Sequence, residues 1–130
     1  MSEETHARTG NREAFERFCD LFYTQKRVAE AFAFLVAGDY RQHNPTIPDG
    51  PDAAVAMLTP KFDGSPDARF EIQRILVDGE LAMVHVKASR PGAPDAAVAD
   101  IYRFEGGRIV EHWDVLQQVP AHAAHDHPMF

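Results

Sequence analysis

The sequence predicts one α+β domain in which three helices are followed by an antiparallel sheet. Apolar residues recur at helical spacing through most of the first half of the chain. From residue 69 onward they instead alternate along short segments separated by turn residues. With 130 residues, of which 45% are hydrophobic, the chain is long enough to bury a single core.

The first two predicted helices follow a frayed polar lead at residues 1–9. Helical spacing of large apolar residues predicts an amphipathic helix over about residues 11–25 and a second one over about residues 26–37. Gly38 is suited to end the second helix. Cys19, the single cysteine, lies in the apolar stripe of the first helix, and we expect a buried, inert thiol.

A short extended segment and a third helix come next. Residues 39–45 are expected to be extended, because the proline at the end of this segment disfavours helix in the residue before it. Pro51 then marks the first turn of a helix, and either Pro60 or Gly64 ends it.

The second half of the chain predicts four strands, at about residues 69–78, 81–88, 97–104 and 109–116. The first strand breaks its alternation once, which indicates a β-bulge. It ends at Asp78-Gly79, a frequent hairpin turn. We place the domain core at residues 12–120 and expect the His-rich tail at residues 121–130 to be flexible.

A lone carboxylate stands on an apolar strand face. Asp100 shares this face with Val98, Tyr102 and Phe104. A carboxylate with such neighbours loses hydration, so it can hold a proton near neutral pH and act as a general acid or base. The alternative is a buried aspartate that is satisfied by hydrogen bonds and has no chemical role.

A histidine on the preceding strand is the predicted partner of this carboxylate. When the hairpin is centred on residues 91–94, His85 falls opposite Asp100 across the ladder. An imidazole at that position would interact with the carboxylate, which would fix the imidazole tautomer and tune the pKa of both groups.

The last hairpin allows two registers. A two-residue turn at residues 106–107 puts Trp113 on the face of Asp100, whereas a three-residue loop at residues 105–107 puts His112 and Asp114 there. The residues themselves permit both registers.

Charge and hydropathy argue against several classes of partner. The net charge of −7, without a basic stripe, argues against nucleic acid and anionic membranes. No apolar run reaches the length of a membrane span and the N-terminus is charged, so we expect a cytoplasmic protein. His43, His85 and His112 come from separate segments without tight ligand spacing, so no metal site is predicted.

The hairpin at residues 100–114, together with residues 40–45 and 50–53, resembles the SnoaL-like polyketide cyclase family, and the likeness covers about residues 12–120. The hairpin is most similar to a subgroup of small bacterial proteins predicted to catalyse aldol condensation. The resemblance implies the cone-shaped, cystatin-like α+β fold of the nuclear-transport-factor-two-like superfamily, in which helices and a curved sheet enclose a deep pocket. It also implies a small-molecule substrate, a homodimer, and neither cofactor nor metal.

The resemblance also assigns site residues. The family's general acid/base aspartate matches Asp100, and the family geometry favours the loop that turns His112 and Asp114 inward. The base of the related ketosteroid isomerases falls near Asn44, which cannot act as a base, so that route of isomerisation is not expected. The residues expected at the pocket rim are Tyr40, His43 and Asn44.

The leading hypothesis is therefore a cofactor-independent cyclase or aldol-condensing enzyme. Its predicted catalytic residues are Asp100, His85 and His112, and its predicted substrate-binding residues are Tyr40, His43, Asn44 and Asp114. The alternative is a non-catalytic domain of the same fold that binds a small ligand or dimerises. A dimer could use Ile109, Trp113 and Val115, which alternate as an apolar set that the three-residue loop would turn outward.

Overall fold

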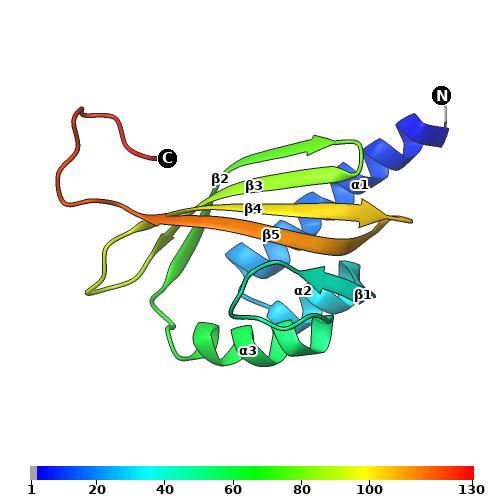
Figure 1. Cartoon of the computed structure of the whole chain (residues 1–130), viewed down its shortest axis with the longest axis horizontal. Helices are drawn as coiled ribbons and strands as arrows, with labels where there is room; N and C mark the ends of the chain where they lie inside the picture. The colour runs from blue at the N-terminus through cyan, green and yellow to red at the C-terminus, as the bar shows by residue number, and fades with distance from the viewer. Residues whose placement is uncertain (1–2) are drawn as a thin grey trace.

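Helices cover one face of a five-stranded sheet (Figure 1), which confirms the predicted α+β class. The computed structural model describes residues 3–130, with side chains from Gly10 onward. The strands are β1 (Val36–Gln42), β2 (Arg69–Asp78), β3 (Leu81–Ser89), β4 (Ala96–Glu105) and β5 (Arg108–Gln118). Their order across the sheet is β1-β5-β4-β3-β2. All neighbours are antiparallel except β1 and β5, which run parallel.

The helical half differs from the prediction at its start. The helices are α1 (Glu3–Cys19), a π-helical turn η1 (Asp20–Thr24), α2 (Val28–Leu35) and α3 (Pro51–Asp63). The expected polar lead is wrong for residues 3–9, which are helical, because several good helix formers extend the helix towards the N-terminus. Residues 1–2 lie outside the described part.

The second helix also differs from the prediction at its end, whereas the third ends at one of the two predicted residues. Helix α2 stops at Leu35 because Val36 already pairs with β5 in the sheet. Helix α3 continues through Pro60 to Asp63, and Gly64 is its C-terminal cap. None of the described helices is long and apolar enough to cross a membrane.

The first hairpin of the sheet is the one predicted. Strand β2 has the expected bounds, and its register shifts between Ile72 and Arg74, where the bulge was expected. Gly79 takes a positive φ of 61° in the turn, which favours glycine at this position.

The second hairpin has a different register from the predicted one. Val84, not His85, lies opposite Asp100, and His85 pairs with Ala99. The loop between β3 and β4 is centred on Gly92 rather than between residues 92 and 93, and a shift of one residue turns every side chain to the other face. The predicted His85–Asp100 pair is therefore wrong. The His85 imidazole instead contacts the Arg74 guanidinium at 2.8 Å on the outer face.

The last hairpin combines features of both expected alternatives. It turns through Gly106 and Gly107, both with positive φ, as a two-residue turn. The register then shifts: Phe104 pairs with Ile109 but Arg103 pairs with Glu111, so Val110 is the extra residue of a bulge. Beyond this bulge, Asp100 pairs with Asp114, so β5 turns inward the same residues as the three-residue loop would, although the pairing is shifted by two residues.

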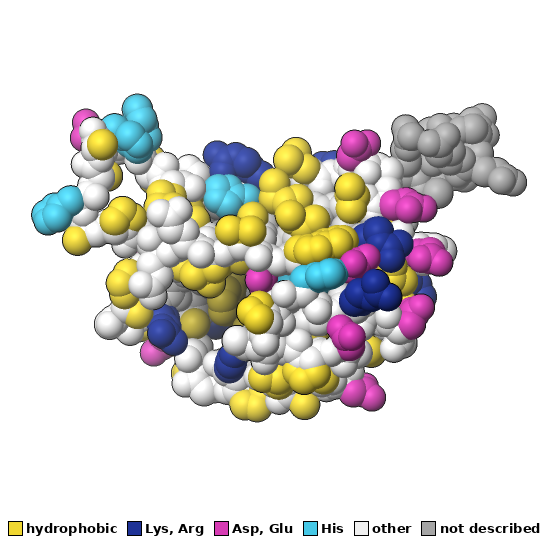
Figure 2. Space-filling view, viewed as in Figure 1, with side chains coloured by type: hydrophobic (Ala, Val, Ile, Leu, Met, Phe, Trp, Pro, Cys, Tyr) yellow, Lys and Arg dark blue, Asp and Glu magenta, His cyan; other side chains and the backbone are white. Residues whose placement is uncertain are grey.

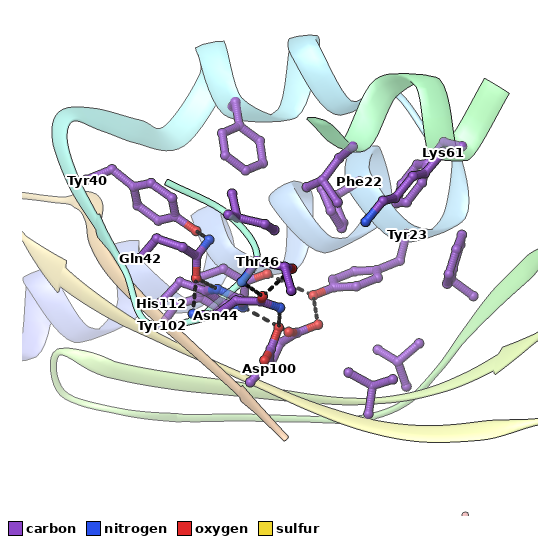
Figure 3. Close-up of a pocket in the computed structure, with 18 residues that line it drawn as sticks. Phe22, Tyr23, Tyr40, Gln42, Asn44, Thr46, Lys61, Asp100, Tyr102 and His112 are labelled. Carbon is purple, nitrogen blue, oxygen red and sulfur yellow. Dashed lines mark hydrogen bonds and ion pairs between the residues drawn. The ribbon is translucent and has the colours of Figure 1, made fainter. Parts of the chain in front are cut away.

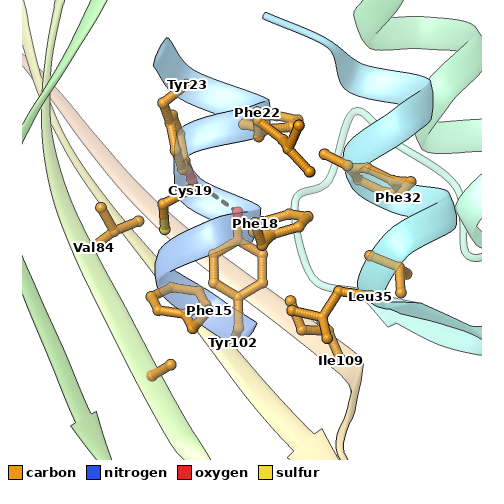
Figure 4. Packing of buried hydrophobic residues seen from close by; sticks show 14 of the residues in the cluster. Phe15, Phe18, Cys19, Phe22, Tyr23, Phe32, Leu35, Val84, Tyr102 and Ile109 are labelled. Atoms are coloured by element: carbon orange, nitrogen blue, oxygen red, sulfur yellow. Dashed lines mark hydrogen bonds between the residues drawn. The ribbon is translucent and has the colours of Figure 1, made fainter. Parts of the chain in front are cut away.

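An aromatic cluster connects the helices to the sheet (Figure 4). Phe18 of α1 has no exposed surface, and its ring lies 5.5 Å from that of Tyr102 and 6.0 Å from that of Phe32. Ile109 is also completely buried in this core, so its expected place in an outward apolar set is wrong. The extra residue Val110 explains the difference, because it changes which side chains of β5 face inward.

Candidate active site

A cavity of about 190 Å³ lies between the Asp100 face of the sheet and the helices (Figure 3). Aromatic and aliphatic side chains form most of its wall, which is typical of a small-molecule pocket. The polar residues that line it are Tyr23, Tyr40, Gln42, Asn44, Thr46, Lys61, Asp100, Tyr102, His112 and Asp114.

Asp100 lies at the centre of this polar set and is 7% exposed. The Tyr23 hydroxyl donates a hydrogen bond to Asp100 Oδ2 at 2.5 Å. Because that proton is committed, Tyr102 must be the donor in the 2.8 Å contact between the two tyrosine hydroxyls. Burial and the nearby Asp100 charge raise the pKa of Tyr23 and of Tyr102 well above the ordinary value. Both phenols therefore stay protonated, as a chain of donors aimed at Asp100.

The π-helical turn brings Tyr23 to this position. Turn η1 extends α1 by one wider turn, a feature that is frequent at functional sites. Sequence analysis missed Tyr23, because its spacing places it in the apolar stripe of the first helix. The available signal was its hydroxyl, since a buried tyrosine needs a hydrogen-bond partner.

Gln42 fixes the proton on one nitrogen of His112. The backbone N–H of Asn44 can only donate, and it donates to Gln42 Oε1 at 3.0 Å, which identifies that atom as the amide oxygen. The same oxygen lies 2.6 Å from His112 Nδ1. Nδ1 must therefore carry a hydrogen.

The other nitrogen of the same ring faces the carboxylate. His112 Nε2 lies 2.8 Å from Asp100 Oδ1, and both residues are buried. With Nδ1–H fixed, an electrically neutral pair contains one proton between Nε2 and Oδ1. The pair is then either imidazolium and carboxylate or imidazole and carboxylic acid. This arrangement is suited to both uptake and release of a proton.

A second carboxylate adjoins the pair. Asp114 lies directly opposite Asp100 in the ladder, on the cavity side. Asn44 Nδ2 donates to Asp114 Oδ2 at 2.7 Å, and Asn44 Oδ1 accepts the backbone N–H of Thr46 at 3.0 Å. Asn44 thus closes an Asx turn after β1 and orients Asp114 at the same time.

Strand β1 presents alternate residues to the cavity. Tyr40 and Gln42 line it, and Asn44 continues the alternation beyond the strand. Tyr40 is 2% exposed and accepts a hydrogen bond from Gln42 Nε2 at 3.3 Å, so its own hydroxyl hydrogen is available to a ligand. Burial and the Asp100 charge raise the pKa of Tyr40, so it keeps that hydrogen.

His43 does not line the cavity, and its predicted place at the rim is wrong. Regular alternation along β1 points it to the outer face of the sheet. There its ring stacks on Trp113 at 4.9 Å between centroids, and Nε2 contacts Glu111 at 2.6 Å. Of the predicted site residues, the structure therefore brings Asp100, His112, Asp114 and a rim of Tyr40 and Asn44 together, and it separates His43 and His85 from them.

Three ligand-type residues of this site lie close together. One ligand atom from each of Asp100, His112 and Asp114 lies within 4.8 Å of the other two, a spacing that a metal ion could also use. Asp100 Oδ1 and His112 Nε2 are already hydrogen-bonded to each other.

The profile of the SnoaL-like domain matches residues 15–112 of the chain. A search of curated proteins found no significant match.

Solved structures share the fold at low sequence identity. A nuclear-transport-factor-two-like protein of unknown function from Mesorhizobium loti has a TM-score of 0.71 at 22% identity, over 85% of this chain and 93% of that one. A proposed ketosteroid isomerase from Kribbella flavida has a TM-score of 0.71 at 19% identity, over 90% and 84%. IdmH from Streptomyces antibioticus, a proposed polyketide cyclase, has a TM-score of 0.63 at 19% identity, over 82% and 91%. These likenesses confirm the fold that the resemblance implied.

Proposed function

This chain belongs to the SnoaL-like domain family, and from that premise we propose that it is a cofactor-independent enzyme of cyclase or aldol-condensation type. Its substrate is a small carbonyl compound. The observation that carries the proposal is the buried Asp100–His112 pair in a largely apolar cavity. Such a pair supplies the proton transfers that carbon–carbon bond formation beside a carbonyl requires.

The reaction begins at Asp100. Its carboxylate takes the acidic proton from the carbon beside the carbonyl, which leaves an enolate next to protonated Asp100 and the His112 imidazolium. The Tyr40 hydroxyl donates to the enolate oxygen, and the second hydrogen of the Asn44 amide is a further donor on the same side of the cavity.

The second half of the reaction returns the proton. The enolate carbon attacks a second carbonyl carbon, one C–C bond forms, and the electron pair moves to the oxygen of that carbonyl. Asp100 then gives the proton to the resulting alkoxide. No proton is gained or lost overall, so the Asp100–His112 pair ends in its starting state and no redox partner is required.

Gln42 is expected to act as a positioning residue. Gln42→Leu removes the acceptor that holds the hydrogen on His112 Nδ1, so the Nε2–H tautomer should become populated and turnover should fall by about tenfold or more. Nitrogen-15 NMR of the imidazole reports the tautomer directly. Gln42→Glu keeps an acceptor oxygen and should retain the original tautomer, whereas Gln117→Leu on the exposed end of β5 is the matched control. An unchanged tautomer in Gln42→Leu would contradict this role.

Metal removal tests the cofactor-independent mechanism. Dialysis against EDTA is expected to leave turnover unchanged, because the proposed proton transfers use only side chains of this chain. Elemental analysis of the untagged protein should show well under one equivalent of a transition metal. Loss of activity with EDTA, restored by one metal ion, would instead assign Asp100, His112 and Asp114 as metal ligands.

A non-catalytic binding domain is the second candidate function. It is favoured by one observation: both oxygens of Asp100 already accept or share hydrogen bonds within the protein. In that case the cavity binds a carbonyl compound without proton transfer, and ligands should be recovered chemically unchanged after long incubation.

We further propose that two copies of the chain pair through the outer face of the sheet. Val115 is 66% exposed there, and Trp113 lies beside it along β5. Light scattering should give twice the 14.5 kDa chain mass, and Val115→Arg should give the single chain mass. Ala33→Arg, an exposed position on α2, is the control. A single-chain mass for the unaltered protein would exclude this pairing.

A further inference from the structure

A second, larger chamber opens beside the catalytic cavity. It has a volume of about 410 Å³ and lies between the end of α3, the segment at residues 65–70 and the ends of β3, β4 and β5. Both chambers are lined by Leu58, Lys61, Phe62 and Phe70, so they adjoin along a common wall. Figure 2 shows a hollow in the face of the molecule between α3 and the sheet, with hydrophobic side chains inside and basic ones beside it.

The inner cavity alone is small for a substrate. At about 190 Å³ it falls below the ~300–1,000 Å³ that is usual for ligand pockets, whereas the two chambers together fall within that range. The rings of Phe62 and Phe70 stack at 4.9 Å between centroids on the shared wall. Because the two chambers share these lining residues, a ligand at Asp100 that extends past Phe62 and Phe70 has room for a second, apolar part in the outer chamber.

Two cations line the outer chamber. Lys61 comes from α3 and Arg90 from the end of β3, and both are exposed. Among residues 10–130, neither forms an ion pair, although other basic residues such as Arg12 and Arg103 are paired with carboxylates. In Figure 3 the end of the Lys61 side chain points from α3 towards the cavity. Two unpaired cations at one chamber are notable in a chain with a net charge of −7.

We propose that the outer chamber is a subsite for the distal part of an elongated substrate that ends in an anionic group such as a carboxylate. The apolar wall contacts the middle of this substrate, and Lys61 and Arg90 bind its anionic end. The reacting carbonyl then lies in the inner cavity, beside Asp100 and Tyr40. This inference rests on the proposed function for the placement of the carbonyl, but the anion subsite can be tested by binding alone.

The test compares two probes that differ only in charge. They are 6-oxo-6-phenylhexanoate and its primary amide, and calorimetry gives the dissociation constant of each. The carboxylate should bind about tenfold more tightly than the amide at low salt, and less so at high salt, because the cations are exposed to screening. The double variant Lys61→Gln/Arg90→Gln should reduce this preference to less than about threefold.

The control is a double variant that removes the same charge elsewhere. Lys87 and Arg12 line neither chamber, so Lys87→Gln/Arg12→Gln should keep the tenfold preference. Equal binding of the two probes, no binding of either, or a preference that the Lys61/Arg90 variant retains would overturn the subsite.

A third variant separates this inference from the proposed function. Asp100→Asn alters the inner cavity only, so the preference for the carboxylate should persist in it. If the unaltered protein shows this preference but no turnover, the subsite stands and the enzymatic proposal fails. If the unaltered protein turns over small ketones but binds both probes equally, the enzymatic proposal stands and the subsite fails.

Discussion

Asp100→Asn should lower the rate of α-proton exchange by about a hundredfold to ten-thousandfold, the range that a positioned acid or base contributes. The amide cannot take up the substrate proton, yet it has nearly the shape of the carboxylate. The measurement is proton NMR in D₂O, where the unaltered protein should replace the α-hydrogens of small ketones with deuterium. This assay follows the first proposed step without knowledge of the natural second substrate.

The control for this variant is Asp78→Asn, a change of the same kind at an exposed position at the end of β2. It should exchange α-hydrogens at the unaltered rate, and circular dichroism should show both variants folded. Exchange that continues at full rate in Asp100→Asn would remove this residue from the mechanism. Absence of exchange in the unaltered protein with every ketone tested would favour the non-catalytic binding domain.

Phe18→Ala should lower the free energy of unfolding by about 3–5 kcal/mol, as expected for removal of a fully buried ring. That is a large part of the ~5–15 kcal/mol that stabilises a typical domain. Phe18 packs against Tyr102 at 5.5 Å and against Phe22 at 5.7 Å, and Phe22 precedes Tyr23 in η1. The substitution should therefore also loosen the tyrosine donors of Asp100.

Urea denaturation measures the first effect and ligand binding the second. Phe34→Ala is the matched control, because Phe34 is 36% exposed on α2 and should lose under about 1 kcal/mol. Similar losses in the two variants would show that the buried aromatic cluster does not dominate the stability of this domain.

Much of the architecture could be predicted because the relevant signals are local. The bounds of β2, its bulge and the turn at Gly79 follow from apolar alternation and turn chemistry within about ten residues. Asp100 could be found for the same reason, since a carboxylate interrupts an otherwise apolar face of one strand.

The partners of Asp100 were harder to predict, because they depend on register between strands. The loop between β3 and β4 is centred on Gly92, half a residue from the midpoint of Pro91 and Pro94. This difference shifts the pairing by one residue and turns His85 to the outer face. His112 reaches Asp100 only because Val110 is an extra residue, and the sequence Ile109-Val110 is compatible with or without a bulge. The position of Tyr23 depends on the π-helical turn, and five residues are too few for its wider hydrogen-bond spacing to show as a sequence pattern.

The bulge at Val110 has a consequence for alignments of this family. Because Val110 has no partner in the ladder, a relative that lacks one residue at this point can keep Glu111 opposite Arg103 and the same inward-facing acid and imidazole. If the alignment places the gap a few residues later, the residues of β5 between the two gap positions are assigned to the wrong face of the strand. Alignments that shift the gap by three or four positions would therefore place the wrong residue of the relative opposite His112.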